Sequence, residues 1–194
     1  MNYPNGKNAA AIHQQAAMRQ SHGNRGMTLE NDINETNKFY LETDRAIIHK
    51  KPTPIQIVNV NYPKRSAAVI TEAYFKQAST TDYNGIYKAK YVDFEAKETK
   101  NTTSFPFSNI HEHQMKHMAK VLQHGGICFI IIRFSKLGET YYVPAEVLLA
   151  SWKSHLKGGR KSLPYKDIQQ KGFLIPFHYQ ARVNYLNIID HLYF

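Results

Sequence analysis

The sequence predicts a mixed α/β fold with a central sheet and flanking helices, and three patterns lead to this prediction. Residues 81–87 and 91–97 have the alternation of two strands, joined by a tight turn at Lys88 and Ala89. The run 127–132 is wholly apolar, which is typical of a strand that is covered on both sides. Several other segments carry apolar residues at helical spacing, so helices and strands are interspersed along the chain.

Length and composition limit the class of protein. The chain has 194 residues, of which 42% are hydrophobic, enough for one domain with a substantial core. Its single cysteine, Cys128, rules out an internal disulfide framework and lies in the apolar run, which favours a buried thiol. No apolar run approaches the ~18 residues of a spanning helix, and no signal-peptide core is present at the start. We therefore expect a cytoplasmic protein with no membrane partner.

The charge balance favours a polyanionic partner. The 25 lysines and arginines exceed the 15 acidic residues, which gives a formal net charge of +10. Such an excess is typical of nucleic-acid-binding proteins, although an ordinary basic surface would give the same count. Residues 1–24 are rich in Asn, Gln, Ala and His and predict a flexible basic tail, so the folded domain is expected over 25–194.

The first expected elements are a helix and a projecting arm. A helix is predicted from Thr28 to about Leu41, because Thr28 is a good N-cap and apolar residues follow at helical spacing. Residues 50–72 predict an extended two-stranded stalk, since prolines interrupt the strand pattern as they do in edge or projecting strands. The tip of this stalk, at Lys64 and Arg65, is basic. An ordinary edge hairpin is the alternative.

The second half of the chain predicts further helices and a strand. Ser108 or Asn109 is expected to cap a helix that reaches Gln123, where a glycine pair stops it. A second basic zone runs from Lys153 to Lys171. The remaining expected elements are a strand at 141–143 and helices at 145–156 and 183–192.

Charged residues gather in the predicted hairpin. Asp82 opens the first strand, and Glu95 and Lys97 share one face of the second. Two carboxylates on neighbouring strands can hold a hard cation such as Mg²⁺, and Lys97 would place a fixed positive charge beside a phosphate bound there. These parts suit phosphodiester hydrolysis. The spacing alone also fits a solvated surface pair of Glu95 and Lys97.

Other candidate residues have simpler interpretations. His113 and His117 have the spacing of a zinc pair on a helix, but no third ligand is evident, so surface or phosphate-contacting histidines are favoured. Asp93 lies on the Glu95 face and could touch a metal, although pairing with a nearby lysine is the favoured interpretation.

The hairpin also resembles a known family. Asp82 with Glu95-Ala96-Lys97 resembles the D-(x)n-[DE]-x-K signature of the restriction-endonuclease-like nuclease superfamily. Longer blocks resemble the RecU family of Holliday junction resolvases, and with Gln114 and the C-terminal NYLNIIDHLYF they cover nearly all of the chain after residue 23. These blocks are NRGMTLENDINETNKFY (24–40), KKPTPIQIVNVNYPKRSAAVI (50–70), EAYFKQASTTDYNGIY (72–87) and DFEAKETKNTTSFPF (93–107).

The resemblance implies a fold and residue roles. The implied fold is a restriction-endonuclease-like mixed sheet flanked by helices, with a protruding stalk that enters the junction centre. Lys97 would stabilise charge on the scissile phosphate, and Glu30 would have an accessory role. The implied Mg²⁺ ligands are Thr80, Asp82, Glu95 and Gln114.

The resemblance also implies an activity and partners. The implied activity is that of a Mg²⁺-dependent endodeoxyribonuclease that resolves four-way DNA junctions in recombination and repair. It would do so by paired symmetric nicks that leave 5′-phosphate ends. A homodimer and a RecA-type recombinase are the implied protein partners. One alternative is a non-catalytic basic protein that binds nucleic acid or modulates a recombinase, and another is a nuclease that cuts specific duplexes.

Overall fold

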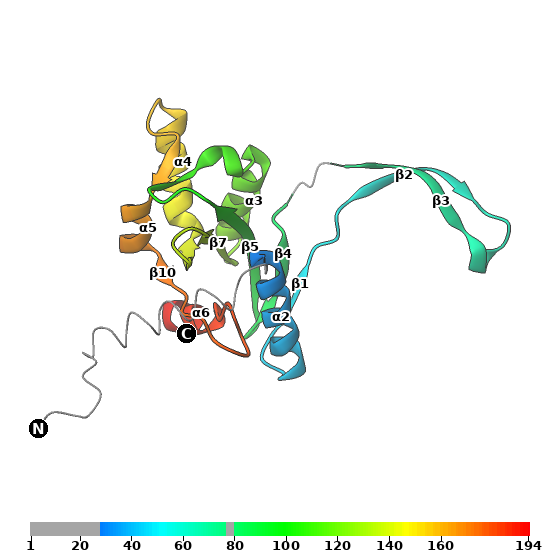
Figure 1. The fold of residues 1–194 in the computed structure, drawn as a ribbon, viewed down its shortest axis with the longest axis horizontal. Helices are drawn as coiled ribbons and strands as arrows, with labels where there is room; N and C mark the ends of the chain where they lie inside the picture. The colour runs from blue at the N-terminus through cyan, green and yellow to red at the C-terminus, as the bar shows by residue number, and fades with distance from the viewer. Residues whose placement is uncertain (1–27, 77–79) are drawn as a thin grey trace, which may run out of the picture.

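A six-stranded mixed sheet forms the centre of the computed structural model, which describes residues 28–76 and 80–194 (Figure 1). The strand order is β1-β4-β5-β7-β8-β10, and every neighbouring pair is antiparallel except β5 and β7. The strands are β1 (Ile47–Lys50), β4 (Tyr83–Tyr87), β5 (Lys90–Thr99), β7 (Ile127–Phe134), β8 (Glu139–Pro144) and β10 (Phe173–Leu174). The predicted fold class is therefore confirmed.

Helices cover both faces of this sheet. On one face, α2 (Leu29–Glu42) and α6 (Leu186–Tyr193) pack on a core cluster with β4 and β5. On the other face lie α3 (Glu112–Gln123), α4 (Ala145–Leu156) and α5 (Tyr165–Lys171). The central strand β7 contributes buried residues to both clusters, which explains its wholly apolar sequence. Within the described part of the chain, no helix has the length and apolar character needed to cross a membrane.

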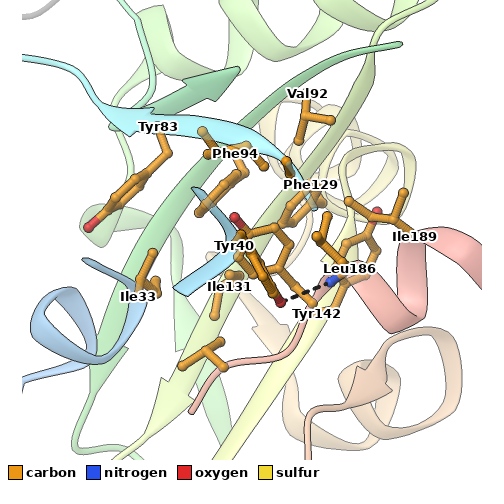
Figure 2. Packing of buried hydrophobic residues seen from close by; sticks show 14 of the residues in the cluster. Ile33, Tyr40, Tyr83, Val92, Phe94, Phe129, Ile131, Tyr142, Leu186 and Ile189 are labelled. Carbon is orange, nitrogen blue, oxygen red and sulfur yellow. Dashed lines mark hydrogen bonds between the residues drawn. The ribbon is translucent and has the colours of Figure 1, made fainter. Parts of the chain in front are cut away.

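Aromatic rings stack across the α2 face of the sheet (Figure 2). Tyr83, Phe94, Phe129 and Tyr142 stack in series with centroid separations of 4.8, 4.7 and 4.2 Å. Such pairs stabilise a core beyond their buried area alone. This series joins β4, β5, β7 and β8, so the hairpin that carries the charged residues is fixed to the rest of the sheet.

The hairpin itself forms around the predicted turn, but its first strand begins at Tyr83 rather than at 81, so Asp82 lies just before β4 instead of opening it. Lys88 and Ala89 have φ angles of 45° and 59°, the positive values that a two-residue type I′ turn requires. Lys88 Nζ donates to Asp190 Oδ1 on α6 at 2.6 Å, and this ion pair helps to hold a non-glycine turn. The β4–β5 register follows directly, with Tyr83 opposite Phe94 and Asn84 opposite Asp93.

The predicted stalk is a separate two-stranded ribbon that projects from the body (Figure 1). Its strands are β2 (Ile55–Asn61) and β3 (Val69–Phe75), connected through the 3₁₀ turn η1 (Arg65–Ala67). Every residue of both strands is exposed, including the apolar side chains of Ile57 and Val69. The ribbon extends to Phe75, three residues beyond the predicted end at 72.

The structure corrects two further boundaries and adds a strand pair to the second basic zone. Ser108 and Asn109 do not cap α3, because they belong to the 3₁₀ turn η2 (Phe107–Asn109), and His111 is the N-cap instead. The closing helix begins at Leu186 rather than at 183. The second basic zone contains β9 (Ser162–Pro164), which pairs with β6 (Ser104–Pro106). The predicted tail at 1–24 lies outside the described residues.

Candidate metal centre

The β4–β5 hairpin brings the two predicted carboxylates together. Tyr83 pairs with Phe94, and continuing this antiparallel register by one residue places Asp82 opposite Glu95. The Asp82 carboxylate raises the pKa of Glu95 through a hydrogen bond and through like charge, so the two groups are close in space. A tight turn thus produces the pair that the spacing predicted.

Glu95 is the member of this pair that is fully buried. Its side chain is 0% exposed, and neither carboxylate oxygen has an aligned hydrogen-bond donor among the described residues. Burial is the main reason that its pKa rises to about 8, with Asp82 the next cause, while Lys97 opposes the rise. A buried carboxylate without an aligned donor is costly even with one ammonium beside it, and a bound cation would reduce that cost.

Lys97 supplies the positive charge. Its Nζ lies 2.6 Å from Glu95 Oε1, and its side chain remains 25% exposed, so the ammonium can reach both the carboxylate and solvent. This location contradicts the alternative in which Glu95 and Lys97 form a solvated surface pair, because Glu95 is fully buried. The pair lies at the boundary between the core and the surface, where a charged substrate could approach.

Thr80 and Gln114 lie on the two segments that flank the carboxylates. Gln114 is buried near the start of α3, and its Oε1 accepts a hydrogen bond from the His111 N–H at 3.0 Å. An amide oxygen has two lone pairs, so this cap leaves one for a further partner. Thr80 is half-buried two residues before Asp82, and its hydroxyl donates weakly to the Thr81 carbonyl at 3.3 Å.

Glu30 approaches the hairpin from the opposite face. It lines a cavity of about 160 Å³ together with Asp82, Tyr83 and Glu98. Burial is the main reason that the pKa of the Tyr83 hydroxyl is raised, and the negative charges of Glu30, Asp82 and Glu95 add to the rise. Glu30 also forms an ion pair with Lys50 at the end of β1.

The residues present suit Mg²⁺ better than a transition metal. Over residues 28–76 and 80–194, no group of three or more His, Cys, Asp or Glu side chains is arranged to hold a metal ion. The predicted set is of another kind, with two carboxylates and oxygen donors from Thr80 and Gln114. Mg²⁺ prefers oxygen ligands and keeps several waters, so two carboxylates beside partly exposed space are enough. The buried oxygens of Glu95, which lack an aligned hydrogen-bond donor among the described residues, fit such an ion.

Comparison with known proteins assigns the chain to a family. The family model described as RecU, Recombination protein U, matches residues 24–191. The chain belongs to the RecU family. It is 63% identical to a protein from Oceanobacillus iheyensis named Holliday junction resolvase RecU, over 196 residues that cover all of both chains. A relative of the same name from Geobacillus kaustophilus is 57% identical over all of this chain and 98% of its own, and one from Listeria welshimeri is 55% identical over 99% and 98%.

The RecU match spans the whole candidate site and the stalk. All of the predicted metal ligands, Lys97 and Glu30 lie inside residues 24–191. The structure brings Asp82, Glu95 and Lys97 together at the end of the hairpin and places Thr80 beside them in the chain. Gln114 comes from α3, the helix that packs on the same face of β5 as Glu95.

Asp93 makes more contacts in the folded chain than its sequence position suggested. The predicted pairing with a lysine is confirmed, since Lys51 Nζ donates to Asp93 Oδ2 at 2.8 Å. Burial alone would raise the pKa of Asp93, but hydrogen bonds from Lys51 and Thr81 lower it below its usual value. Thr81 and His117 also contact it from segments 12 and 24 positions away, which spacing alone could not have revealed.

The two histidines of α3 are not a pair in space. His117 Nε2 lies 3.2 Å from Asp93 Oδ2, so this ring faces the hairpin rather than solvent. His113 stacks on His111, with ring centroids 5.3 Å apart. Burial, His111 and Lys97 lower the pKa of His113, so a mainly neutral imidazole lies near the candidate centre, a neighbour that the sequence did not reveal.

Proposed function

We propose that this protein is a Mg²⁺-dependent endodeoxyribonuclease that resolves four-way DNA junctions by paired symmetric nicks. Membership of the RecU family and the name shared by its relatives, Holliday junction resolvase, support the substrate. The observation that carries the chemistry is Glu95, a buried carboxylate without aligned donors that faces Asp82 and lies beside Lys97.

Each side chain would have a distinct task. Asp82 and Glu95 would supply the charged ligands of Mg²⁺, and Thr80 and Gln114 would supply neutral oxygens. When bound, Mg²⁺ would polarise the scissile phosphate and make a coordinated water more acidic. The Lys97 ammonium would stabilise the negative charge that develops on the phosphate. Attack of water on the phosphorus would form a new P–O bond and break the P–O3′ bond, which would leave a 3′-hydroxyl and a 5′-phosphate end.

The stalk and the symmetry of the substrate favour a homodimer. A four-way junction has approximate two-fold symmetry, so two nicks at equivalent positions call for two equivalent sites in a C2 dimer. An isolated two-stranded ribbon is only marginally stable in water, and this one exposes apolar side chains such as Ile55, Ile57 and Val69. Contact with DNA or with a second copy would cover them.

Cleavage of a synthetic junction tests this function. The purified protein is incubated with an immobile four-way junction and with a duplex of the same sequence, with and without Mg²⁺. We expect paired nicks in the junction only, dependent on Mg²⁺ and lost in Glu95→Gln. Tight junction binding without any nicking would instead identify a non-catalytic DNA-binding protein, and equal cutting of the duplex would identify a different nuclease.

A further inference from the structure

Asp93 is the centre of a hydrogen-bond network at the base of the stalk. Its side chain is 0% exposed and accepts from Lys51 Nζ at 2.8 Å, from the Tyr91 hydroxyl at 2.8 Å and from the Thr81 hydroxyl. His117 Nε2 lies 3.2 Å away. Lys51 Nζ also donates to Thr81 Oγ1 at 2.9 Å, which closes a triangle of contacts. Unlike Glu95, this buried carboxylate is fully satisfied by protein donors, so it has no need of a metal ion.

Two of the partners of Asp93, Lys51 and Thr81, lie at the two ends of the stalk. Lys51 is the first residue after β1, where the chain leaves the body, and Thr81 lies just before β4, where the chain returns. The Lys51 N–H donates to the Asp82 carbonyl at 2.7 Å, so the two ends are also linked through their backbones. Both ends are therefore held to one carboxylate on β5.

The same strand carries the candidate metal centre. Asp93 and Glu95 lie two residues apart on β5 and on the same face, and Thr81 lies between Thr80 and Asp82. Any movement of the stalk base relative to β5 would break contacts of Asp93 and would shift Asp82 at the same time. The geometry thus couples the orientation of the stalk to the arrangement of the metal ligands.

We propose that Asp93 is a positioning residue that fixes the stalk base relative to the metal centre, and so selects which phosphate near the branch point is cut. This proposal rests on the proposed nuclease function. If the stalk engages the junction centre, the distance from the branch point to the cut depends on how rigidly the stalk joins the site. Loosening that joint should spread the cuts over neighbouring phosphates, which a purely structural residue would not do.

Lys51→Met is the sharpest variant for the test. It keeps an unbranched side chain of similar length and removes the ammonium that contacts Asp93 and Thr81. Asp93→Asn is the complementary variant, because its amide N–H₂ would point at donors. Asp190→Asn is the matched control: Asp190 also accepts from a tyrosine and a lysine, Tyr87 and Lys88, but at the far end of the hairpin.

The experiment maps cut positions at nucleotide resolution on an immobile four-way junction. For Lys51→Met we expect the share of cuts at the main phosphate to fall at least two-fold, with junction affinity changed less than about three-fold. Asp190→Asn should lower thermal stability without changing the cut positions. Unchanged positions in both Lys51→Met and Asp93→Asn would overturn the proposal, whereas a wild-type protein that makes no cuts would overturn the nuclease function itself.

Hydrogen exchange of the metal-free protein gives a second readout that does not depend on activity. The amides of residues 49–51, 53 and 80–84 should exchange at least several-fold faster in Lys51→Met than in the wild type, with little change in β7. Asp190→Asn should accelerate exchange near the turn at 88–89 instead. Equal protection of the stalk base in Lys51→Met and wild type would show that this network does not hold the joint, and would also overturn the proposal.

Discussion

Glu95 shows how a functional residue can be unfavourable for the fold. Its carboxylate is buried beside Asp82, and among the residues that the structure describes, the Lys97 ammonium is the cation that offsets its charge. Its pKa therefore rises from an ordinary 4.5 to about 8, mainly because of burial. This arrangement favours binding of a divalent cation, because the ion would neutralise negative charge that the protein itself does not fully neutralise.

The raised pKa predicts how stability depends on pH. Between about 4.5 and 8 the folded metal-free protein holds a proton on Glu95 that the unfolded chain releases, so stability falls as pH rises through this range. Glu95→Gln removes this loss. We expect its thermal midpoint to exceed that of the wild type by ~5 °C, or ~2 kcal/mol, at pH 9, and by much less at pH 5.

Thermal melts of metal-free wild type and Glu95→Gln at the two pH values check this prediction. The same variant should lose junction cleavage by ~10³-fold or more, since it removes a charged metal ligand. Asp190→Asn is a suitable control, because Asp190 is partly exposed and remote from the site. A Glu95→Gln protein that is less stable than wild type at both pH values would contradict the interpretation of Glu95.

At the scale of elements, α2 is anchored by a buried ion-pair cluster. Asp32 is 0% exposed and contacts Arg133 on β7 at 2.7 Å and Arg182 before α6 at 3.1 Å. These contacts hold the helix that carries Glu30 against the sheet. Charged groups in this position are costly once a partner is removed.

Replacement of Asp32 should therefore destabilise the fold strongly. Asp32→Asn removes the buried carboxylate that both arginines contact, and we expect a loss of ~3 kcal/mol in the free energy of unfolding, measured by urea denaturation. Glu42→Gln, at an exposed i,i+4 pair with Lys38 on the same helix, should change stability by less than ~0.5 kcal/mol. Similar effects of the two substitutions would argue against a structural role for the Asp32 cluster.

The stalk is the element that should read the junction. Replacing Lys64 and Arg65 at its tip with alanine should lower the preference for a junction over a duplex by ~10-fold, because contacts at the branch point are lost while other phosphate contacts remain. Competition binding with labelled junction and unlabelled duplex measures this ratio. Lys153→Ala with Lys157→Ala, on and just after α4, provides a charge-matched control that should affect both substrates alike. An unchanged ratio of junction to duplex affinity for the tip variant would show that the stalk tip does not contribute to junction recognition.

Elements with strong local signals could be predicted, whereas long-range contacts could not. Thr28 caps α2, and Lys88 and Ala89 form the turn, because these features depend on neighbours in the sequence. Ser108 has good capping chemistry, yet η2 takes up that segment and the capping box of His111 and Gln114 begins the helix. Tertiary packing overrode the local preference there.

In the candidate site, too, local features could be predicted from the sequence and long-range contacts could not. The hairpin register could be inferred from spacing, so Asp82 and Glu95 were predicted as neighbours. The specific roles of Thr80 and Gln114 came from resemblance to a family, because neither residue type points to a metal by itself. The contacts of Asp93 with Lys51 and His117 join residues 42 and 24 positions apart, and only the folded chain reveals them.

At the scale of the whole molecule, a net charge of +10 should dominate affinity for DNA. Each phosphate that is neutralised by lysine or arginine releases counterions, so the affinity for a junction should fall by ~10³-fold or more between 50 and 200 mM salt. Titrations of labelled junction at several salt concentrations measure the slope. A flat response would contradict recognition led by phosphates.

The central claim is that Asp82 and Glu95 hold a divalent cation within reach of Lys97. A crystal of the protein soaked in Mn²⁺, with anomalous scattering recorded to locate the ion, tests this claim most directly. We expect an anomalous peak at ligand distance from both carboxylates and beside the Lys97 ammonium. Well-ordered carboxylates with no peak between them, or a peak only at some other place, would contradict it.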